Sequence, residues 1–285
     1  MSHLPALALL LALKSIAAQA PAPLLESLAA APAGGPRAAA ASRALVGVRY
    51  VRSALGEGQG PDPDPRFRLD AFDCLGFVET AVALGSARSL DEAARALDDI
   101  RYQGSPALGA RNHEAQSQWI PANLAKGWIV ELTRPLAGER AVPAPIEFTS
   151  ERWSALRRAG RAIGGLPAAR APVGTFELWA VAPADVAALA PRIPDGTLVF
   201  VVREDMPGRS TRISHVGLLV TGPSGGRSVR HATTWPGQER VVEEPLSVFM
   251  DHQRRGKPGW PLVGFALFGL PDQSARVAAL MADPT

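Results

Sequence analysis

The stretch DAFDCLGFVETAVAL, from Asp70 to Leu84, contains Cys74, the single cysteine in a chain of 285 residues. Its apolar residues recur at helical spacing, so we predict a largely buried helix from Asp73 to about Gly85. Asp73 suits the helix N-cap, which places Cys74 in the first turn, where free backbone N–H groups and the helix dipole stabilise a thiolate. The same N–H groups can bind a developing oxyanion. This context favours a reactive thiol over the alternative, a small structural core residue.

The rest of the chain predicts an α+β fold. Helical patterns cover 38–55 and the segment that begins at the capping box SLDE, residues 89–92, and ends near Tyr102. Beyond Pro167, β-branched and apolar runs bounded by Gly, Pro and Asp indicate antiparallel strands: TFELWAV, GTLVFVVRE, ISHVGLLVT, SVRHATT and, near the end, PLVGFALFGL. Helices first and strands later favour a sheet that packs on the helix carrying Cys74.

Two histidines lie on consecutive predicted strands. His215 is inside ISHVGLLV, His231 is inside SVRHATT, and the turn sequence TGPSGG joins the two runs. A hairpin folded about Pro223 or Ser224 brings His231, or a residue two positions away, opposite His215 on one face of the sheet. If the helix of Cys74 packs on that face, a thiol, a base and an orienting group form a line. Each histidine alone also fits a half-buried structural role.

Composition excludes several classes of protein. The net charge is +3 and the arginines are spread along the chain without a block of like charges, so we predict no nucleic-acid interface. A mildly basic surface suits an anionic partner such as a cell-wall polymer, although a solvated surface is the ordinary interpretation. A single cysteine excludes an internal disulfide framework and a Cys-rich zinc site. No carboxylate or third histidine stands at an obvious ligand spacing around the histidine pair, so we expect neither a metal nor a cofactor.

Three motifs resemble those of a known family. FDCLGFVE, SHVGLLV and RHATT are similar to the cysteine motif, the histidine motif and the third-residue segment of NlpC/P60 cell-wall peptidases. The chain most resembles the DUF1460 branch, because the block from Ile100 to Thr133, the run IPDGTLVFVV and the two histidine motifs follow in the family's order. The resemblance extends from about Leu45 to Leu270. It implies a papain-like α+β fold and a cysteine amidase that cleaves peptidoglycan fragments between N-acetylmuramic acid and the L-alanine of the stem peptide.

The resemblance also implies roles for individual residues. Cys74 matches the nucleophile, His215 the general base and His231 the residue that orients this base. Tyr50, in GVRYV, matches a small-x-x-Tyr segment and is a candidate oxyanion donor, with an ordinary partly buried tyrosine as the alternative. Four residues of the matched block are candidates for lining the sugar or peptide cleft, with capping or packing as the alternative for each: Arg111, His113, Trp119 and Asn123.

Other functions remain compatible with these motifs. Departures from the DUF1460 pattern at Leu75, Gly76 and Glu114 put the fine substrate specificity in doubt more than the catalytic residues. A stem-peptide endopeptidase of the same fold, an acyltransferase or deamidase, and a non-catalytic wall-binding module are the alternatives. The last needs no nucleophile, so the complete Cys/His/His set argues against it.

The N-terminal residues suggest export. Residues 1–20 resemble a secretory signal peptide, with an apolar run from Leu4 to Leu13 and the cleavage pattern Ala18-Gln19-Ala20, although no Lys or Arg precedes the run. The run is shorter than the ~20 residues of a membrane span, so we expect no integral membrane segment in the mature chain. Residues 21–37, rich in Ala, Pro and Gly, are expected to form a tether, and 38–285 a single catalytic domain. These features predict a periplasmic or secreted protein, with a helical N-terminal extension as the alternative.

Overall fold

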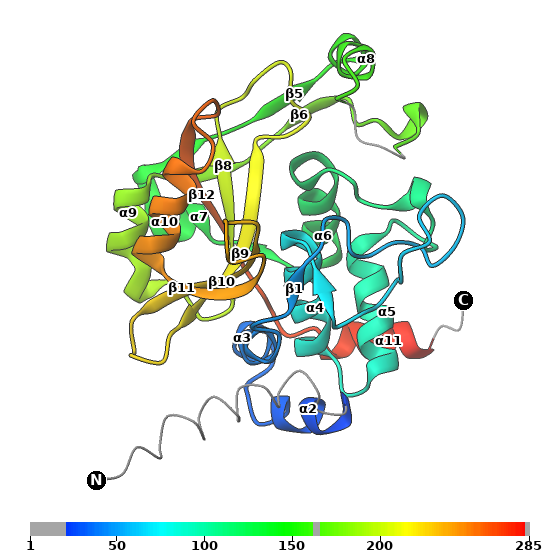
Figure 1. Cartoon of the computed structure of the whole chain (residues 1–285), viewed down its shortest axis with the longest axis vertical. Coiled ribbons are helices and arrows are strands. Elements are labelled where there is room, and N and C mark those ends of the chain that lie inside the picture. Colours follow the sequence, from blue (N-terminus) through cyan, green and yellow to red (C-terminus); the bar gives the residue numbers. More distant parts are fainter. Residues whose placement is uncertain (1–20, 162–165, 283–285) are drawn as a thin grey trace.

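The computed structural model describes residues 21–161 and 166–282 and shows a large sheet between helical layers (Figure 1). The helices are α2 (Pro21–Leu28), α3 (Gly35–Ala44), α4 (Cys74–Ser86), α5 (Leu90–Arg101), α6 (Ile120–Lys126), α7 (Thr133–Ala137), α8 (Ser150–Arg158), α9 (Pro183–Leu189), α10 (Leu246–Arg255) and α11 (Ser274–Ala282). The strands are β1 (Arg49–Tyr50), β2 (Ala71–Phe72), β3 (Val130–Glu131), β4 (Ala141–Pro143), β5 (Ile146–Phe148), β6 (Gly174–Phe176), β7 (Trp179–Val181), β8 (Thr197–Arg203), β9 (Ile213–Thr221), β10 (Arg227–Thr233), β11 (Arg240–Pro245) and β12 (Leu262–Gly269).

The large sheet is mixed and has the order β2-β1-β11-β10-β9-β8-β12-β7-β4, with β3 paired to β12. Strands β8, β9 and β10 are consecutive antiparallel neighbours, which confirms this part of the predicted meander, and β11 extends it. The prediction is wrong for the run TFELWAV, which divides into β6, paired with β5, and β7, paired with β12 and β4. Strand β12 pairs with β8. At one edge, β1 pairs in parallel with β2 and antiparallel with β11. The predicted helix over 38–55 is wrong beyond Ala44, because the chain leaves α3 there and Arg49 and Tyr50 join the sheet.

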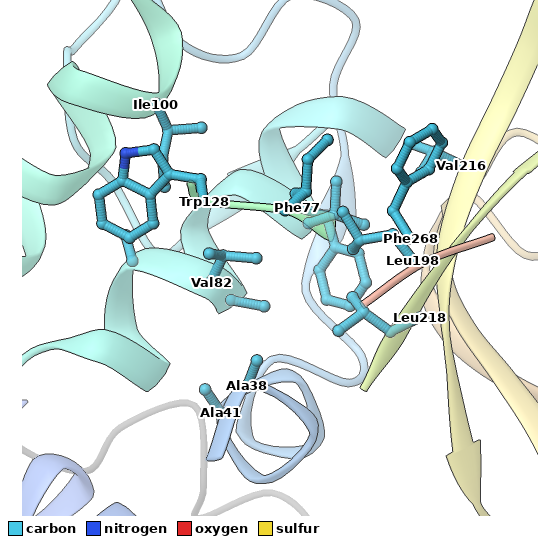
Figure 2. Close-up of a cluster of buried hydrophobic side chains, with 14 of the residues drawn as sticks. Ala38, Ala41, Phe77, Val82, Ile100, Trp128, Leu198, Val216, Leu218 and Phe268 are labelled. Atoms are coloured by element: carbon cyan, nitrogen blue, oxygen red, sulfur yellow. The ribbon is translucent and has the colours of Figure 1, made fainter. Parts of the chain in front are cut away.

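Two helical layers cover the two faces of the sheet. Residues 216, 218 and 220 of β9 point into the core cluster that contains the apolar face of α4, whereas Leu219 points into the cluster with Phe249 of α10. Figure 2 shows Phe77 and Val82 of α4 in this first cluster, with Val216 and Leu218 of the sheet. Alternation along one strand therefore assigns α4 and α10 to opposite faces, as the arrangement in Figure 1 also shows.

The segment expected to be a tether is folded. Helix α2 lies within residues 21–37, and Leu25 and Leu28 on one side of it are only 7% and 3% exposed. Leucines three residues apart share a helix face, and burying them provides the energy that an isolated eight-residue helix lacks. The tether prediction is therefore wrong for this part, whereas the predicted signal peptide at 1–20 lies outside the described residues.

A small lobe extends from the end of the sheet at the top of Figure 1. Strands β5 and β6 pair there, and α8 packs on them through Trp153, which stacks on Phe148 with ring centroids 4.5 Å apart. Arg152 of α8 binds the carboxylate of Asp205, which follows β8, at 2.6 Å. The lobe is thereby connected to the loop between β8 and β9. Among the described residues, no helix is long and apolar enough to cross a membrane.

Candidate active site

Helix α4 begins at the cysteine. The side chain of Asp73 accepts a hydrogen bond from the backbone N–H of Gly76 at 2.7 Å, which confirms the predicted N-cap and places Cys74 at the first helical position. The other carboxylate oxygen of Asp73 accepts from the backbone N–H of Ser53 at 3.1 Å. Cys74 keeps part of its surface exposed. The cap thus fixes a partly accessible thiol at the start of a buried helix.

The two histidines are hydrogen-bonded to each other. The β9–β10 register pairs residue 221 with 227 and residue 218 with 230, so the hairpin is centred on Ser224 as predicted. In this register His215 and His231 are diagonal neighbours on one face. Their Nε2 and Nδ1 atoms are 2.8 Å apart, and the rings are nearly perpendicular, at 88°.

Gly217 makes room for this pair. A Cβ atom at position 217 would lie 2.7 Å from Cγ1 of Val229, 2.8 Å from the carbonyl oxygen of Arg230 and 3.0 Å from Cβ of His231. Such distances are shorter than ordinary contacts, so no larger residue fits without displacing the neighbouring strand. The absence of a side chain at Gly217 lets β10 approach β9 and lets His231 reach across toward His215.

The face of the sheet that carries the histidines is not the face that α4 covers. Phe249 of α10 lies against both imidazoles, with ring centroids 6.1 Å from His215 and 5.0 Å from His231. Helix α4 packs on the same sheet from the other side. We expected Cys74, His215 and His231 to form a line if α4 packed on the histidine face. Helix α4 does not pack on that face, so this condition is not met.

The thiol instead meets β9 beyond the β10 ladder. Val216, directly after His215, lies past the last β9–β10 pair, which joins Leu218 to Arg230. Its backbone N–H acts on the Cys74 sulfur and lowers the pKa of the thiol. The β8–β9 register also shifts next to His215, between the pairs that end at Val201 and Val202. An irregularity of this kind re-aims a side chain, and it occurs directly before His215 and Val216.

Burial disfavours the charged forms of both Cys74 and His215. Burial, and then the carboxylate of Asp73, raise the pKa of the Cys74 thiol to about 12, against the smaller lowering effect of nearby backbone N–H groups. Burial, followed by the charges of His231, Lys257 and Arg203, holds the pKa of His215 well below 6.5. The predicted stabilisation of a thiolate by the helix N-terminus is therefore outweighed by desolvation and by the capping carboxylate.

Glu244 extends the network, and the sequence analysis missed it. It lies on β11 in register with Val229 of β10, and its Oε2 is 3.5 Å from Nε2 of His231. Its carboxylate also contacts Nδ1 of His252 at 3.1 Å. Burial opposes ionisation of Glu244, but its contacts with His231 and His252 hold its pKa below the usual value. The only signal for Glu244 in the sequence was a carboxylate on the strand after His231.

The bond between the two rings needs one nitrogen that donates and one that accepts. Nε2 of His231 makes no hydrogen bond within the described residues, although the Glu244 carboxylate lies 3.5 Å away. If the hydrogen of His231 is on this Nε2, its Nδ1 accepts and Nε2 of His215 donates in the 2.8 Å bond. In that tautomer Nδ1 of His215 has a free lone pair, the state that a general base requires.

Tyr50 lies beside the thiol because of strand pairing. Strand β1 pairs in parallel with β2, and Tyr50 is in register with Phe72, two residues before Cys74. Burial, and then the neighbouring charges of Cys74 and Asp73, raise the pKa of Tyr50 to about 12. Its phenol thus keeps its proton and remains able to donate a hydrogen bond near the start of α4.

A cavity of about 590 Å³ adjoins the start of α4, and we call it the cysteine-side cavity. Its lining includes Asp73, Leu75, Gly76, Glu79, Arg111 and His113. Arg111 is held by Glu57 and Asp62 at 2.5 and 2.7 Å, and Nε2 of His113 contacts the carbonyl oxygen of Leu108 at 2.6 Å. Two of the four candidate binding residues therefore reach this cavity.

The other two candidates lie in the core. Trp119 is 2% exposed and donates its indole N–H to Glu79 at 2.7 Å. Asn123 is fully buried and donates to the carbonyl oxygens of Ile100 and Trp119. Their packing role, the alternative considered from the sequence, is the one that the structure describes. In the described part of the chain, no group of three or more His, Cys, Asp and Glu side chains has an arrangement that could hold a metal ion.

Comparisons with known proteins agree with this architecture. The model of a family described as AmiA-like, N-acetylmuramoyl-L-alanine amidase-like, matches residues 40–257. A Legionella pneumophila structure assigned to DUF1460 is 21% identical over 88% of this chain and 94% of its own, with a TM-score of 0.72. Two Bacteroides uniformis structures of an N-acetylmuramoyl-L-alanine amidase are 20% and 19% identical, each covering 82% of this chain and 97% of its own, with TM-scores of 0.61 and 0.63. The search of curated proteins found no significant match.

Proposed function

Because the chain belongs to the AmiA-like, N-acetylmuramoyl-L-alanine amidase-like family, we propose that it is a peptidoglycan amidase with Cys74 as its nucleophile. The scissile bond is the amide between the lactyl group of N-acetylmuramic acid and the L-alanine of the stem peptide. The observation that carries this proposal is the 2.8 Å bond between His215 and His231, formed where the backbone next to His215 meets the thiol. A binding module has no need of a base with an oriented lone pair.

In the proposed reaction, Cys74 is the nucleophile and His215 transfers the proton. The sulfur of Cys74 attacks the amide carbonyl while its proton moves to Nδ1 of His215. The C–N bond then breaks as the imidazolium returns this proton to the nitrogen of L-alanine, leaving a thioester on the enzyme. Water gives a proton to His215 and attacks the thioester, which releases the lactyl carboxylic acid and restores the thiol. Tyr50 donates its O–H to the oxyanion, as do backbone N–H groups at the start of α4.

The electrostatics favour a proton transfer that is coupled to the attack. A thiol with a pKa of about 12 and a base with a pKa well below 6.5 do not form an ion pair at rest. The imidazolium formed during the attack is stabilised through His231 by the carboxylate of Glu244. The charge therefore develops only when substrate is present, which protects the single thiol from unspecific reaction.

Fold class and location are part of the same proposal. A cysteine at a helix N-terminus, followed by two histidines on adjacent strands, is the order of the NlpC/P60 papain-like enzymes that the motifs resemble. Peptidoglycan lies outside the cytoplasmic membrane, so residues 1–20 serve as a signal peptide and the substrate is a muropeptide in the periplasm or outside the cell.

One experiment distinguishes the amidase from its alternatives. N-acetylmuramoyl-L-alanyl-γ-D-glutamyl-diaminopimelate is incubated with the wild type and with Cys74→Ala, and the products are identified by mass spectrometry. The amidase releases free N-acetylmuramic acid and an intact tripeptide, whereas an endopeptidase releases diaminopimelate. Cys74→Ala should be inactive and keep its circular dichroism spectrum. Intact substrate with the wild type would reject hydrolysis, and release by Cys74→Ala would reject the nucleophile.

The division of roles is tested with two matched variants. His215→Gln should lose roughly 10²–10⁴-fold in kcat, the contribution of a positioned proton-transfer group. His231→Gln should lose less, because its amide oxygen can still accept from His215. Equal losses in the two variants would contradict the assignment of base and orienting group.

A further inference from the structure

A second cavity, of about 720 Å³, adjoins the histidine, and we call it the histidine-side cavity. Its lining includes Arg161, Gly208, Arg209, Thr211, Ser214 and Trp260. Ser214 directly precedes His215, just as Asp73 and Leu75 of the cysteine-side cavity flank Cys74. Each cavity is therefore lined by chain neighbours of one of these two residues, although neither lining includes Cys74 or His215 itself.

The histidine-side cavity is cationic. Arg161 and Arg209 line it, and the Nζ atom of Lys257 lies 5.9 Å from the ring centroid of Trp260, a lining residue. Within 21–161 and 166–282, these three cations have no carboxylate at ion-pair distance. The described lining of the cavity includes no Asp or Glu; of the two acidic residues just before it in the chain, Asp205 is bound by Arg152 at 2.6 Å and Glu204 is exposed. The uncompensated charge of the cavity is therefore positive.

The guanidinium groups of the exposed residues Arg209 and Arg161 each lie against a neighbouring group. The guanidinium of Arg209 lies 4.0 Å from the ring centroid of Trp260, and this indole donates to the carbonyl oxygen of Glu204 at 2.8 Å. On the other side, a Cβ atom on Gly208 would lie 2.6 Å from Nη1 of Arg161, so this guanidinium rests on the loop. Arg152 fixes the same loop through the carbonyl oxygens of Met206 and Arg209. Preorganised guanidinium groups bind carboxylates with less loss of entropy.

The direction of proton transfer indicates which part of the substrate each cavity binds. In the proposed mechanism His215 gives its proton to the departing amine, so the leaving group lies on the side of the histidine, and the acyl group lies on the side of the cysteine. The leaving group of the proposed reaction is the stem peptide. Its second residue, D-glutamate, is joined through its γ-carboxyl group and keeps a free α-carboxylate. The leaving group is therefore anionic close to the scissile bond.

We propose that the histidine-side cavity is the subsite for the acidic stem peptide and that Arg161, Arg209 and Lys257 bind its carboxylates. This inference rests on the proposed function for the identity of the leaving group. Lys257 lies beside Trp260, a residue of the cavity lining, and its charge acts on His215. Arg161 and Arg209 line the cavity and suit the carboxylates beyond L-alanine, for which a planar guanidinium offers paired hydrogen bonds.

The first test compares two substrates that differ by one charge. N-acetylmuramoyl-L-alanyl-D-glutamate is used with its α-carboxyl group free or amidated. The double variant Arg161→Ala/Arg209→Ala should lose about tenfold to a hundredfold in kcat/KM for the acid, the size expected for charged hydrogen bonds, and far less for the amide. Arg192→Ala removes one exposed arginine outside the cavity and is the control, with no change expected. Equal losses for acid and amide would show a structural role and overturn the assignment.

The second test measures binding without turnover. Calorimetry with Cys74→Ala records the affinity for the tripeptide L-alanyl-γ-D-glutamyl-diaminopimelate and for its α-amidated form. Preference for the acid, lost when Arg161→Ala/Arg209→Ala is added, supports the subsite even if the wild type fails to cleave the muramoyl amide. Binding that does not depend on these arginines overturns the subsite even if the amidase activity is confirmed.

Discussion

Gly217→Ala should break the catalytic site through the histidine pair. The new methyl group would lie 2.8 Å from the carbonyl oxygen of Arg230 and 3.0 Å from Cβ of His231, whereas ordinary contacts begin at 3.4 Å. Backbone of β10 must therefore retreat by about 0.6 Å, which is typical of an overpacked core and costs about 1–3 kcal/mol of unfolding free energy. A similar retreat of His231 stretches its 2.8 Å bond to His215 beyond a normal hydrogen bond.

The effect on catalysis is calculable in the same way. Proton transfer contributes roughly 10²–10⁴-fold, and a base that keeps its nitrogen but loses its orientation should lose about ten- to hundredfold in kcat. The assays are urea unfolding for stability and mass-spectrometric kinetics on the muramoyl tripeptide for kcat. Gly226→Ala is the matched control in the turn of the same hairpin, because its nearest atom, Oγ of Ser224, is 3.8 Å away. It should be neutral or slightly stabilising, by about 0.4–1 kcal/mol.

A double-mutant cycle gives the decisive result. If Gly217→Ala acts through His231, it should add almost no further loss of kcat in a His231→Gln background, because the shared interaction is already gone. A full additional loss in that background, or an unchanged kcat in Gly217→Ala itself, would refute the reasoning.

Three other expectations concern the charges and donors of the site. The rate of Cys74 alkylation by iodoacetamide should keep rising through alkaline pH, because burial and Asp73 raise the pKa of the thiol to about 12. A rate that stops rising at a pH below ~8.5, the pKa of a free thiol, would contradict this. The folded protein holds the pKa of His215 well below 6.5, so below that pH the unfolded chain binds a proton that the native state does not. The free energy of unfolding should therefore fall as the pH drops from 6.5 toward the native pKa, and less steeply in His215→Gln, as urea midpoints across this range would show. Tyr50→Phe removes the proposed oxyanion donor and should lower kcat by about 10²–10³-fold with little change in KM, so a change in KM alone would assign Tyr50 to substrate binding instead.

Local signals predicted the parts of the site that depend on neighbours in the chain. The cap of α4 could be predicted because it joins residues only three positions apart: the carboxylate of Asp73 accepts from the N–H of Gly76. The hairpin centred on Ser224 also follows from one short turn between two strands, and its register brings His215 and His231 together.

Long-range pairing explains what the sequence could not provide. Glu244 reaches His231 only because β11 pairs with β10. No residue close to Glu244 in the sequence indicates that its partner is a histidine. The face that α4 covers, and hence the burial that raises the pKa of Cys74, depends on the whole core. Trp119, whose type suits a sugar cleft, is buried because Glu79 inside the core accepts its N–H.

The pairing of β1 with β11 has a consequence for biosynthesis. Arg49 is in register with Arg240, so β1, which is synthesised early, can pair with β11 only when synthesis of the chain is almost complete. Such distant contacts are closed late in folding, since the loop entropy must be overcome before the pairing is gained. Tyr50 and Cys74 leave the ribosome long before Glu244 does. A nascent chain therefore carries its thiol without its base network, and the hydrolase gains activity only after synthesis is nearly complete.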